Sequence, residues 1–165
     1  MYTNTFAKTI FSLFLVLGIY LCFIGGYGSD EDTLPMIGTF INFLNGNFMT
    51  SRFTGYPVAE FIIGFFSYHF GSASINILIF TFFIIGSAIF YNSTQKVYNL
   101  NKTIFFLILL LSNPILFFDN LEPVDYSISF FFFSLGYYFF VKNKIELAVL
   151  FFGICIGTRI NFAPF

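Results

Sequence analysis

The feature that most constrains this chain is a series of long apolar runs that contain almost no charged residues. A helix needs roughly 20 mostly apolar residues to cross a bilayer, so we expect these runs to be membrane-spanning helices. Pro114 lies in the third run, which is short, and predicts a kink or a helix end near that residue. The expected fold class is therefore an all-α, polytopic membrane protein with five spans. The runs cover residues 6–27, 72–91, 103–118, 126–141 and 145–162.

Composition excludes most other classes of protein. Only 9% of the 165 residues are charged, against about 25% in soluble domains, so the polar side chains are too few to cover a soluble globule. The net charge of −1 provides no basic face for nucleic acid. Cys22 and Cys155 lie inside apolar runs, where we expect small buried side chains. No Walker motif, Rossmann glycine pattern, zinc-ligand spacing or nucleophile elbow occurs in the sequence, so nothing in it supports an energy supply from a cytoplasmic nucleotide.

The positions of the charges predict the orientation of the spans. With a cytoplasmic N-terminus, five spans place every lysine on the cytoplasmic side, as the positive-inside rule requires. Seven of the eight acidic residues then lie outside, and Glu146 lies at the cytoplasmic edge. The lysines are Lys8, Lys96, Lys102, Lys142 and Lys144, and the outer acids are Asp30, Glu31, Asp32, Glu60, Asp119, Glu122 and Asp125.

The first outer loop, residues 28–71, is the one long segment between the spans and the expected location of a functional site. Apolar residues at helical spacing predict an amphipathic helix that lies along the outer leaflet and ends at residues 45–47. Pro57 favours the first turn of a second helix, and Gly71 is the expected break before the next span. We expect His69 to be packed or interfacial rather than catalytic. The spaced apolar residues are Leu34, Ile37, Phe40, Ile41 and Leu44.

Three consecutive acids, Asp30, Glu31 and Asp32, open this loop at the exit of the first span. Carboxylates at a membrane surface can act as a general base or bind a divalent metal ion, and both roles stay open here. A purely structural role is the alternative, because Ser29 and Asp32 have the spacing of a capping box. Adjacent residues on a helix diverge by about 100°, so one or two of the three acids can face the same site.

Two arginines break the lysine pattern on the outer side. Arg52 lies in the first outer loop and Arg159 lies near the outer end of the last span. Arginine suits bidentate contacts with phosphate or carboxylate, and within a helix it needs a partner or a position near the headgroups. The second outer loop, residues 119–125, adds three acids that we expect to be simply solvated.

The order of these features resembles the N-terminal half of a GT-C glycosyltransferase, the superfamily of protein O-mannosyltransferases and aminoarabinose transferases of lipid A. The matching residues are Asp30-Glu31, Arg52 and Gly55-Tyr56-Pro57, and more loosely residues 112–114 and 153–159. The resemblance covers the whole chain through short motifs. It implies an integral protein of the bacterial plasma membrane whose active face is extracytoplasmic.

The resemblance also implies roles for the residues. The donor would be a sugar linked to polyprenyl phosphate, and the acceptor a glycan, lipid or protein outside the cytoplasm. Asp30 would be the base, with Glu31 and Asp32 as alternatives, and Arg52 or Arg159 would hold the donor phosphate. Gly55, Tyr56 and Pro57 would shape the loop.

Residues 1–165 are expected to form one membrane domain. The superfamily usually has about twice as many spans, so we expect a fragment or a chain completed by another. A noncatalytic membrane scaffold and a transporter or flippase component of envelope glycan assembly are the alternatives. The span interiors carry almost no charge, which disfavours transport.

Overall fold

The computed structural model describes residues 2–28, 33–47, 49–51, 56–95, 97 and 113–159. Helices make up the regular structure of these residues, and no strand occurs among them, so the expected all-α class is confirmed. The helices are α1 (Tyr2–Ile24), α2 (Thr33–Leu44), α3 (Pro57–Thr94), α5 (Pro114–Asp119), α6 (Tyr126–Val141) and α7 (Ile145–Thr158).

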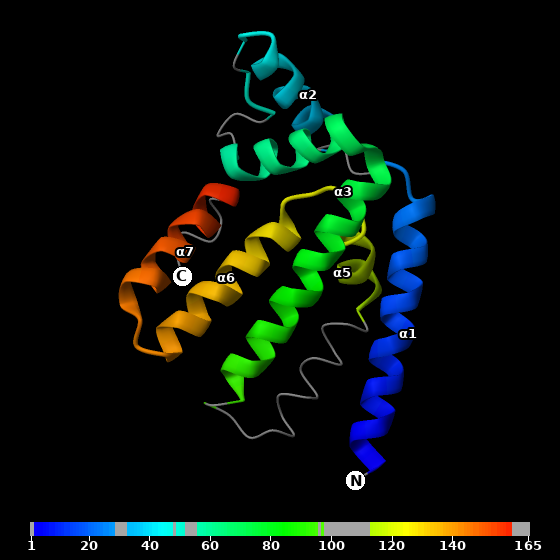
Figure 1. The fold of residues 1–165 in the computed structure, drawn as a ribbon, viewed down its shortest axis with the longest axis vertical. Helices are drawn as coiled ribbons and strands as arrows, with labels where there is room; N and C mark the ends of the chain where they lie inside the picture. Colours follow the sequence, from blue (N-terminus) through cyan, green and yellow to red (C-terminus); the bar gives the residue numbers. More distant parts are fainter. Residues whose placement is uncertain are drawn as a thin grey trace.

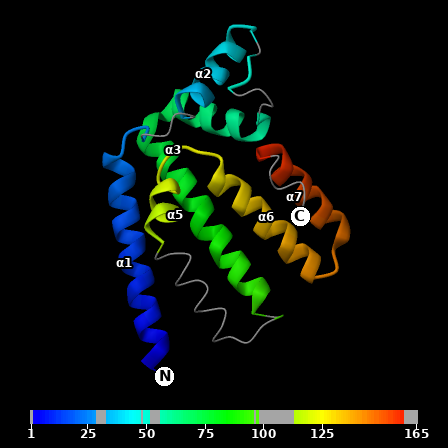
Figure 2. The ribbon, with the colours of Figure 1, turned by 180° about the vertical axis from the view of Figure 1, so that it is seen from behind.

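Figures 1 and 2 show how these helices are arranged. The long part of α3 runs beside α1 and α6, and α7 packs on the other side of α6. The helix α2, the first part of α3 and the C-terminal part of α7 lie at one end of the molecule, which we call the α2 end (Figure 1). The N-terminus, the end of α3 and the turn between α6 and α7 lie toward the opposite end.

The two parts of α3 meet at Gly71. This residue has φ 78° and ψ −177°, a backbone conformation that residues other than glycine rarely adopt, and the helix direction changes there. Pro57 occupies the first turn of α3, where its missing N–H group is not needed. Both predictions are confirmed. In the third apolar run Pro114 is the first residue of α5, and residues 103–112 lie outside the described part of the chain.

The lengths of the helices bear on the predicted spans. Among the described residues α3 is the one helix that is both long and apolar enough to cross a membrane, with a mean hydropathy of 2.2 over its most apolar window. The other apolar stretches are shorter, at 10–17 residues. They are the segment Ser12–Ile24 of α1 and the helices α2, α6 and α7.

Small residues allow α3 to pack closely on α1 and α6. A Cβ atom at Gly18 would overlap the ring of Phe80, and one at Gly86 would lie 3.1 Å from the Cα atom of Phe131. The buried amide of Asn76 donates hydrogen bonds to the carbonyl oxygens of Cys22 (3.3 Å) and Gly26 (2.7 Å). It thereby binds carbonyl groups at the end of α1 that have no partner within that helix.

The helix α2 has the predicted extent, and only part of the predicted apolar stripe packs on α3. The predicted end at residues 45–47 is confirmed, and Gly46 has a positive φ of 78°. Met36 and Phe40 are buried against α3, whereas Leu34, Ile41 and Leu44 are exposed. Most of the predicted apolar stripe therefore points away from α3.

Candidate functional site at the α2 end

The structure describes three of the predicted site residues. Asp30, Glu31, Asp32, Arg52 and Gly55 lie outside the described residues, so their predicted roles stay predictions. Tyr56, Pro57 and Arg159 are described, and all three lie at the α2 end. Tyr56 is buried in the apolar cluster around Ile63 and Ile79.

Arg159 directly follows α7 and has a defined partner. Its Nη1 atom donates a hydrogen bond to Asp125 Oδ1 at 3.1 Å, which also makes the two side chains an ion pair. The guanidinium carbon lies 3.8 Å from the ring centroid of Tyr126, in cation–π contact. The Arg159 side chain is 15% exposed, so it remains at the edge of the packed interior. Arginine near the end of a span was expected to need a partner, and this expectation is confirmed.

Asp125 comes immediately before α6 and is fully buried. Its carboxylate faces Arg159 and makes no capping hydrogen bond to α6, although its position is that of the N-cap residue. Asn120 and Leu121, from the same connection, are also buried. Pro123 and Val124 are buried too, so the expectation that residues 119–125 are simply solvated is wrong for most of the connection, which folds inward over the helix ends.

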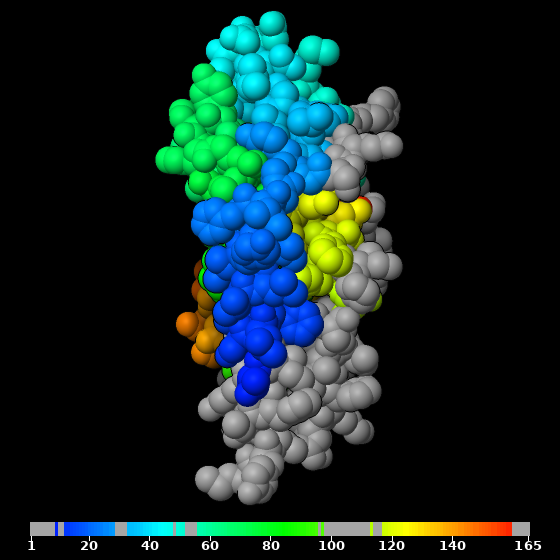
Figure 3. Space-filling model, turned by 90° about the vertical axis from the view of Figure 1, so that its right-hand side faces the viewer, coloured from blue at the N-terminus to red at the C-terminus, as the bar shows by residue number. Residues whose placement is uncertain are grey.

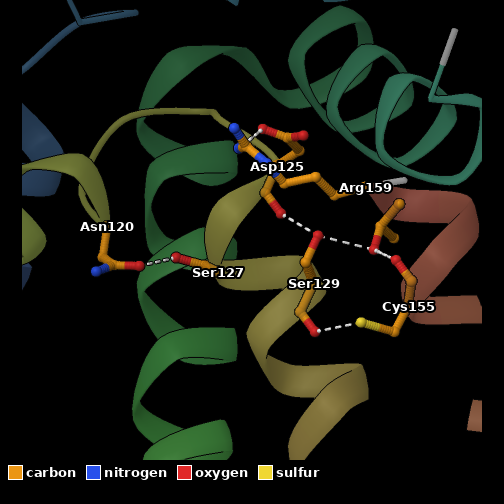
Figure 4. Close-up of polar contacts among 7 residues, drawn as sticks. Asn120, Asp125, Ser127, Ser129, Cys155 and Arg159 are labelled. Atoms are coloured by element: carbon orange, nitrogen blue, oxygen red, sulfur yellow. Dashed lines mark hydrogen bonds and ion pairs between the residues drawn. The ribbon is translucent and has the colours of Figure 1, made fainter. Parts of the chain in front are cut away.

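Polar side chains continue from Asp125 into the contact between α6 and α7 (Figure 4). Ser129 Oγ lies 2.9 Å from the backbone oxygen of Asp125 and 2.8 Å from Thr158 Oγ1. Cys155 Sγ donates to the backbone oxygen of Ser129 at 3.3 Å. On the other side of α6, Ser127 Oγ donates to Asn120 Oδ1. These contacts fix the end of α7, and therefore Arg159, relative to the start of α6.

Glu60 is a second buried carboxylate, in the first turn of α3, and its residue is 2% exposed. Its Oε1 atom accepts hydrogen bonds from the backbone N–H of Ser51 (3.0 Å), the Ser51 hydroxyl and the backbone N–H of Tyr56 (3.2 Å). Its Oε2 atom is buried and has no hydrogen-bond partner among the described residues. A buried polar atom left in this state costs about 1–3 kcal/mol.

A cavity of about 430 Å³ lies between α2 and the first part of α3 and is lined in part by Glu60. This volume is within the usual range for small-molecule sites. We call the cavity the α2–α3 groove. Its other lining residues are Thr39, Phe40, Phe43, Pro57, Val58, Phe61 and Ile62, so six of the eight lining side chains are apolar.

The two carboxylate centres belong to neighbouring parts of the α2 end. A Cβ atom at Gly157 would lie 3.3 Å from a methyl carbon of Val58, so the last turn of α7 touches the start of α3. Figure 4 shows the first part of α3 passing close to the end of α7 that precedes Arg159. Gly28 faces the side chain of Glu122 at the same end. The arrangement brings a cation, two buried carboxylates and an apolar groove to one end of the bundle.

The burial of Asp125 and Glu60 was not predicted from the sequence, although the sequence around each of them indicates it. Glu60 is a lone acid inside the apolar run Val58-Ala59-Glu60-Phe61-Ile62-Ile63, where a solvated side chain is not expected. Asp125 directly precedes an apolar helix, and an arginine stands near the same end of the next helix. A buried carboxylate needs a partner, so a charge at such a position indicates one.

Two further expectations concern metal binding and His69. The described residues contain no group of three or more His, Cys, Asp and Glu side chains that could hold a metal ion. The alternative of a metal held by Asp30, Glu31 and Asp32 lies outside those residues. His69 is exposed and packs against the ring of Phe65, with centroids 4.7 Å apart, as expected of a packed or interfacial histidine.

The chain matches no protein-family model, no curated protein and no solved structure. The fold and the site therefore define a helical protein with a polar centre at one end of an apolar bundle.

Proposed function

We propose that this chain is a polytopic membrane protein whose α2 end faces away from the cytoplasm. The first support is the exposed apolar surface. Figure 3 shows α1 lying along the surface of one side of the molecule, and its exposed side chains include Val16, Tyr20 and Phe23, each more than 60% exposed. Exposed apolar surface of this extent is typical of contact with lipid or a partner, and single soluble domains rarely show it.

The second support is the distribution of charge along the bundle. Residues 12–24, 61–94, 126–141 and 147–158 contain no Asp, Glu, Lys or Arg. Lys142 and Lys144 lie in the turn at one end, and Glu60, Asp125 and Arg159 lie at the other. This separation is what the positive-inside rule predicts if the turn between α6 and α7 is cytoplasmic.

The proposed activity is transfer of a sugar from a polyprenyl-phosphate-linked donor to an extracytoplasmic acceptor. Arg159, with Arg52, would bind the donor phosphate, and Asp30 would be the base on the acceptor, with Glu31 and Asp32 as alternatives. The observation that carries the proposal is the position of Arg159 directly after α7 at the α2 end, where Asp125 and Tyr126 hold the guanidinium at the edge of the apolar interior. A guanidinium has five N–H donors, and the ion pair uses one nitrogen, Nη1.

A transfer assay with the full-length protein in liposomes tests this activity. We expect transfer from a polyprenyl-phosphate sugar, a loss of about 100-fold or more in Asp30→Asn or Asp32→Asn, and a smaller loss in Arg52→Lys. The matched control is Glu146→Gln, a change of the same kind in the turn at the opposite end. Wild-type transfer by both aspartate variants would rule out the base, and absence of transfer by every form would favour a noncatalytic scaffold.

The orientation has its own test. Cys22 and Cys155 are buried, so a cysteine introduced near residue 50 or residue 98 is the main reactive thiol. In sealed cells we expect an impermeant thiol reagent to label the first position from outside and not the second. The reverse pattern would overturn the orientation without deciding the activity.

A further inference from the structure

The lining of the α2–α3 groove offers a polar ligand almost nothing to bind. Thr39 and Glu60 are its two polar lining residues, and both are buried. The Thr39 hydroxyl already donates to the backbone oxygen of Pro35 at 3.1 Å. Glu60 Oε1 accepts hydrogen bonds from Ser51 and Tyr56, and Oε2 has essentially no accessible surface. The surface that an occupant of the groove can touch is therefore hydrocarbon.

This lining decides the chemistry of the occupant. A polar group that enters the groove gives up its hydrogen bonds to water and finds no replacement, which opposes binding. A hydrocarbon chain gives up no hydrogen bond and removes apolar surface from water, both its own and that of the groove. The groove therefore fits an apolar chain and excludes polar ligands of the same size.

We propose that the α2–α3 groove holds one hydrocarbon chain of a membrane phospholipid. The chain lies against Phe40 of α2 and against Val58 and Ile62 of α3, and the headgroup stays outside the groove. Phe43 and Phe61 also line the groove and are more than half exposed, so the groove is continuous with apolar surface that a chain can cross from the bilayer.

A protein partner would be another source of apolar groups, but the surroundings of the groove favour lipid. Residues 33–47 contain no Asp, Glu, Lys or Arg, and Glu60, which is buried, is the one such residue among residues 56–70. The surface around the groove therefore lacks the exposed charges that give a protein interface its specificity. The inference rests on the proposed membrane location and is independent of the proposed transfer reaction.

Fluorescence quenching can test the site because the chain contains no tryptophan. Phe40→Trp places one reporter on the groove wall of the full chain, reconstituted in nanodiscs of phosphatidylcholine with brominated chains. Phe40 is 5% exposed, so a chain that stays outside the groove makes little contact with it. Phe117→Trp is the matched control, because Phe117 is also 5% exposed and is not a groove residue. Phe23→Trp reports lipid contact at the exposed face of α1.

With half of the lipid brominated, mass action places a brominated chain in the groove about half of the time, so the fluorescence of Phe40→Trp should fall to about half. The fluorescence of Phe117→Trp should change little, and that of Phe23→Trp should fall because α1 faces lipid. Iodide, which stays in the water, should leave Phe40→Trp unquenched.

Quenching of Phe23→Trp without quenching of Phe40→Trp would overturn the proposal and leave the membrane location intact. Equal quenching of Phe40→Trp and Phe117→Trp would also overturn it, as would quenching of Phe40→Trp by iodide, which would show a groove filled with water. If the brominated lipid quenches none of the three reporters, both the proposal and the membrane location are wrong. A failed transfer assay leaves the result untouched, since no sugar donor is present.

Phe43→Trp is the second reporter if Phe40→Trp fails to fold, and Phe70→Trp is its control, because Phe70 is exposed and is not a groove residue. After transfer from brominated lipid into lipid-free detergent, Phe43→Trp should keep the quenching that Phe70→Trp loses, because the groove retains its chain. Equal loss of quenching in the two reporters would overturn the proposal.

Discussion

The two buried carboxylates at the α2 end are compensated by different kinds of partner. Asp125 is paired with a cation, Arg159, which lies 34 residues further along the chain and on the next helix. Glu60 accepts hydrogen bonds from neutral groups of Ser51 and Tyr56, at most nine residues away. The first centre therefore joins two helices, and the second joins a helix to the segment that precedes it. We expect mutations at the Asp125 centre to affect the whole bundle, and those at Glu60 to act locally.

The largest expected effect is that of Arg159→Ala. Removal of the cation leaves the carboxylate of Asp125 buried without it, and the free energy of unfolding should fall by roughly 3 kcal/mol. The measurement is SDS titration of the detergent-solubilised protein followed by circular dichroism. The double variant Arg159→Ala/Asp125→Ala should recover part of the loss, and additive effects of the two changes would show that the pair is not coupled.

Glu60→Ala should lower the free energy of unfolding by roughly 2 kcal/mol, because the N–H groups of Ser51 and Tyr56 lose their acceptor. Glu60→Gln is the matched variant and should lose less than about 1 kcal/mol, since its carbonyl oxygen still accepts. Limited proteolysis should detect earlier cleavage near residue 50 in Glu60→Ala, with the α6–α7 contact still protected. Loss of protection throughout the bundle would contradict the local role.

Gly64→Ala tests the packing of α2 on α3 without touching either carboxylate. A Cβ atom at Gly64 would overlap the Cβ atom of Phe40. We therefore expect the free energy of unfolding to fall by about 1.5 kcal/mol and α2 to pack less tightly on α3. Gly38→Ala is the control: Gly38 lies on α2 but outside this contact, because nothing lies within 4 Å of its added Cβ atom. That variant should be neutral or more stable by a few tenths of a kcal/mol. Equal destabilisation by both would mean that α2 does not pack on α3 as described.

The smallest expected effect is that of Ser129→Ala, which removes the hydroxyl that contacts Thr158 at 2.8 Å. The expected loss is about 1 kcal/mol, as for a typical buried hydrogen bond. Ser74→Ala is the control, because among the described residues the exposed Ser74 hydroxyl bonds only to the carbonyl oxygen of Phe70 in its own helix. This variant should change stability by less than about 0.5 kcal/mol. A loss at Ser129 no larger than at Ser74 would show that this contact adds nothing to the Asp125 centre.

The local features of the chain were determined by sequence alone. Apolar periodicity located α2, and the restricted φ of proline and the free φ of glycine located the start of α3 at Pro57 and its break at Gly71. These features depend on neighbouring residues and on backbone sterics, which a sequence states directly. The apolar runs likewise gave the all-α class, because their length and spacing are properties of the chain itself.

Contacts between distant residues were decided only by the tertiary structure. The sequence placed Asp125 and Glu60 among the outer acids and predicted a solvated connection around Asp125. In the fold Asp125 is enclosed with Arg159, and Glu60 is buried beneath Ser51 and Tyr56. It also predicted the apolar stripe of α2 but not that Met36 and Phe40 are the residues buried on α3. Burial of a charge depends on which helices meet around it, and the pairing of helices is set by packing of the whole bundle rather than by any local pattern.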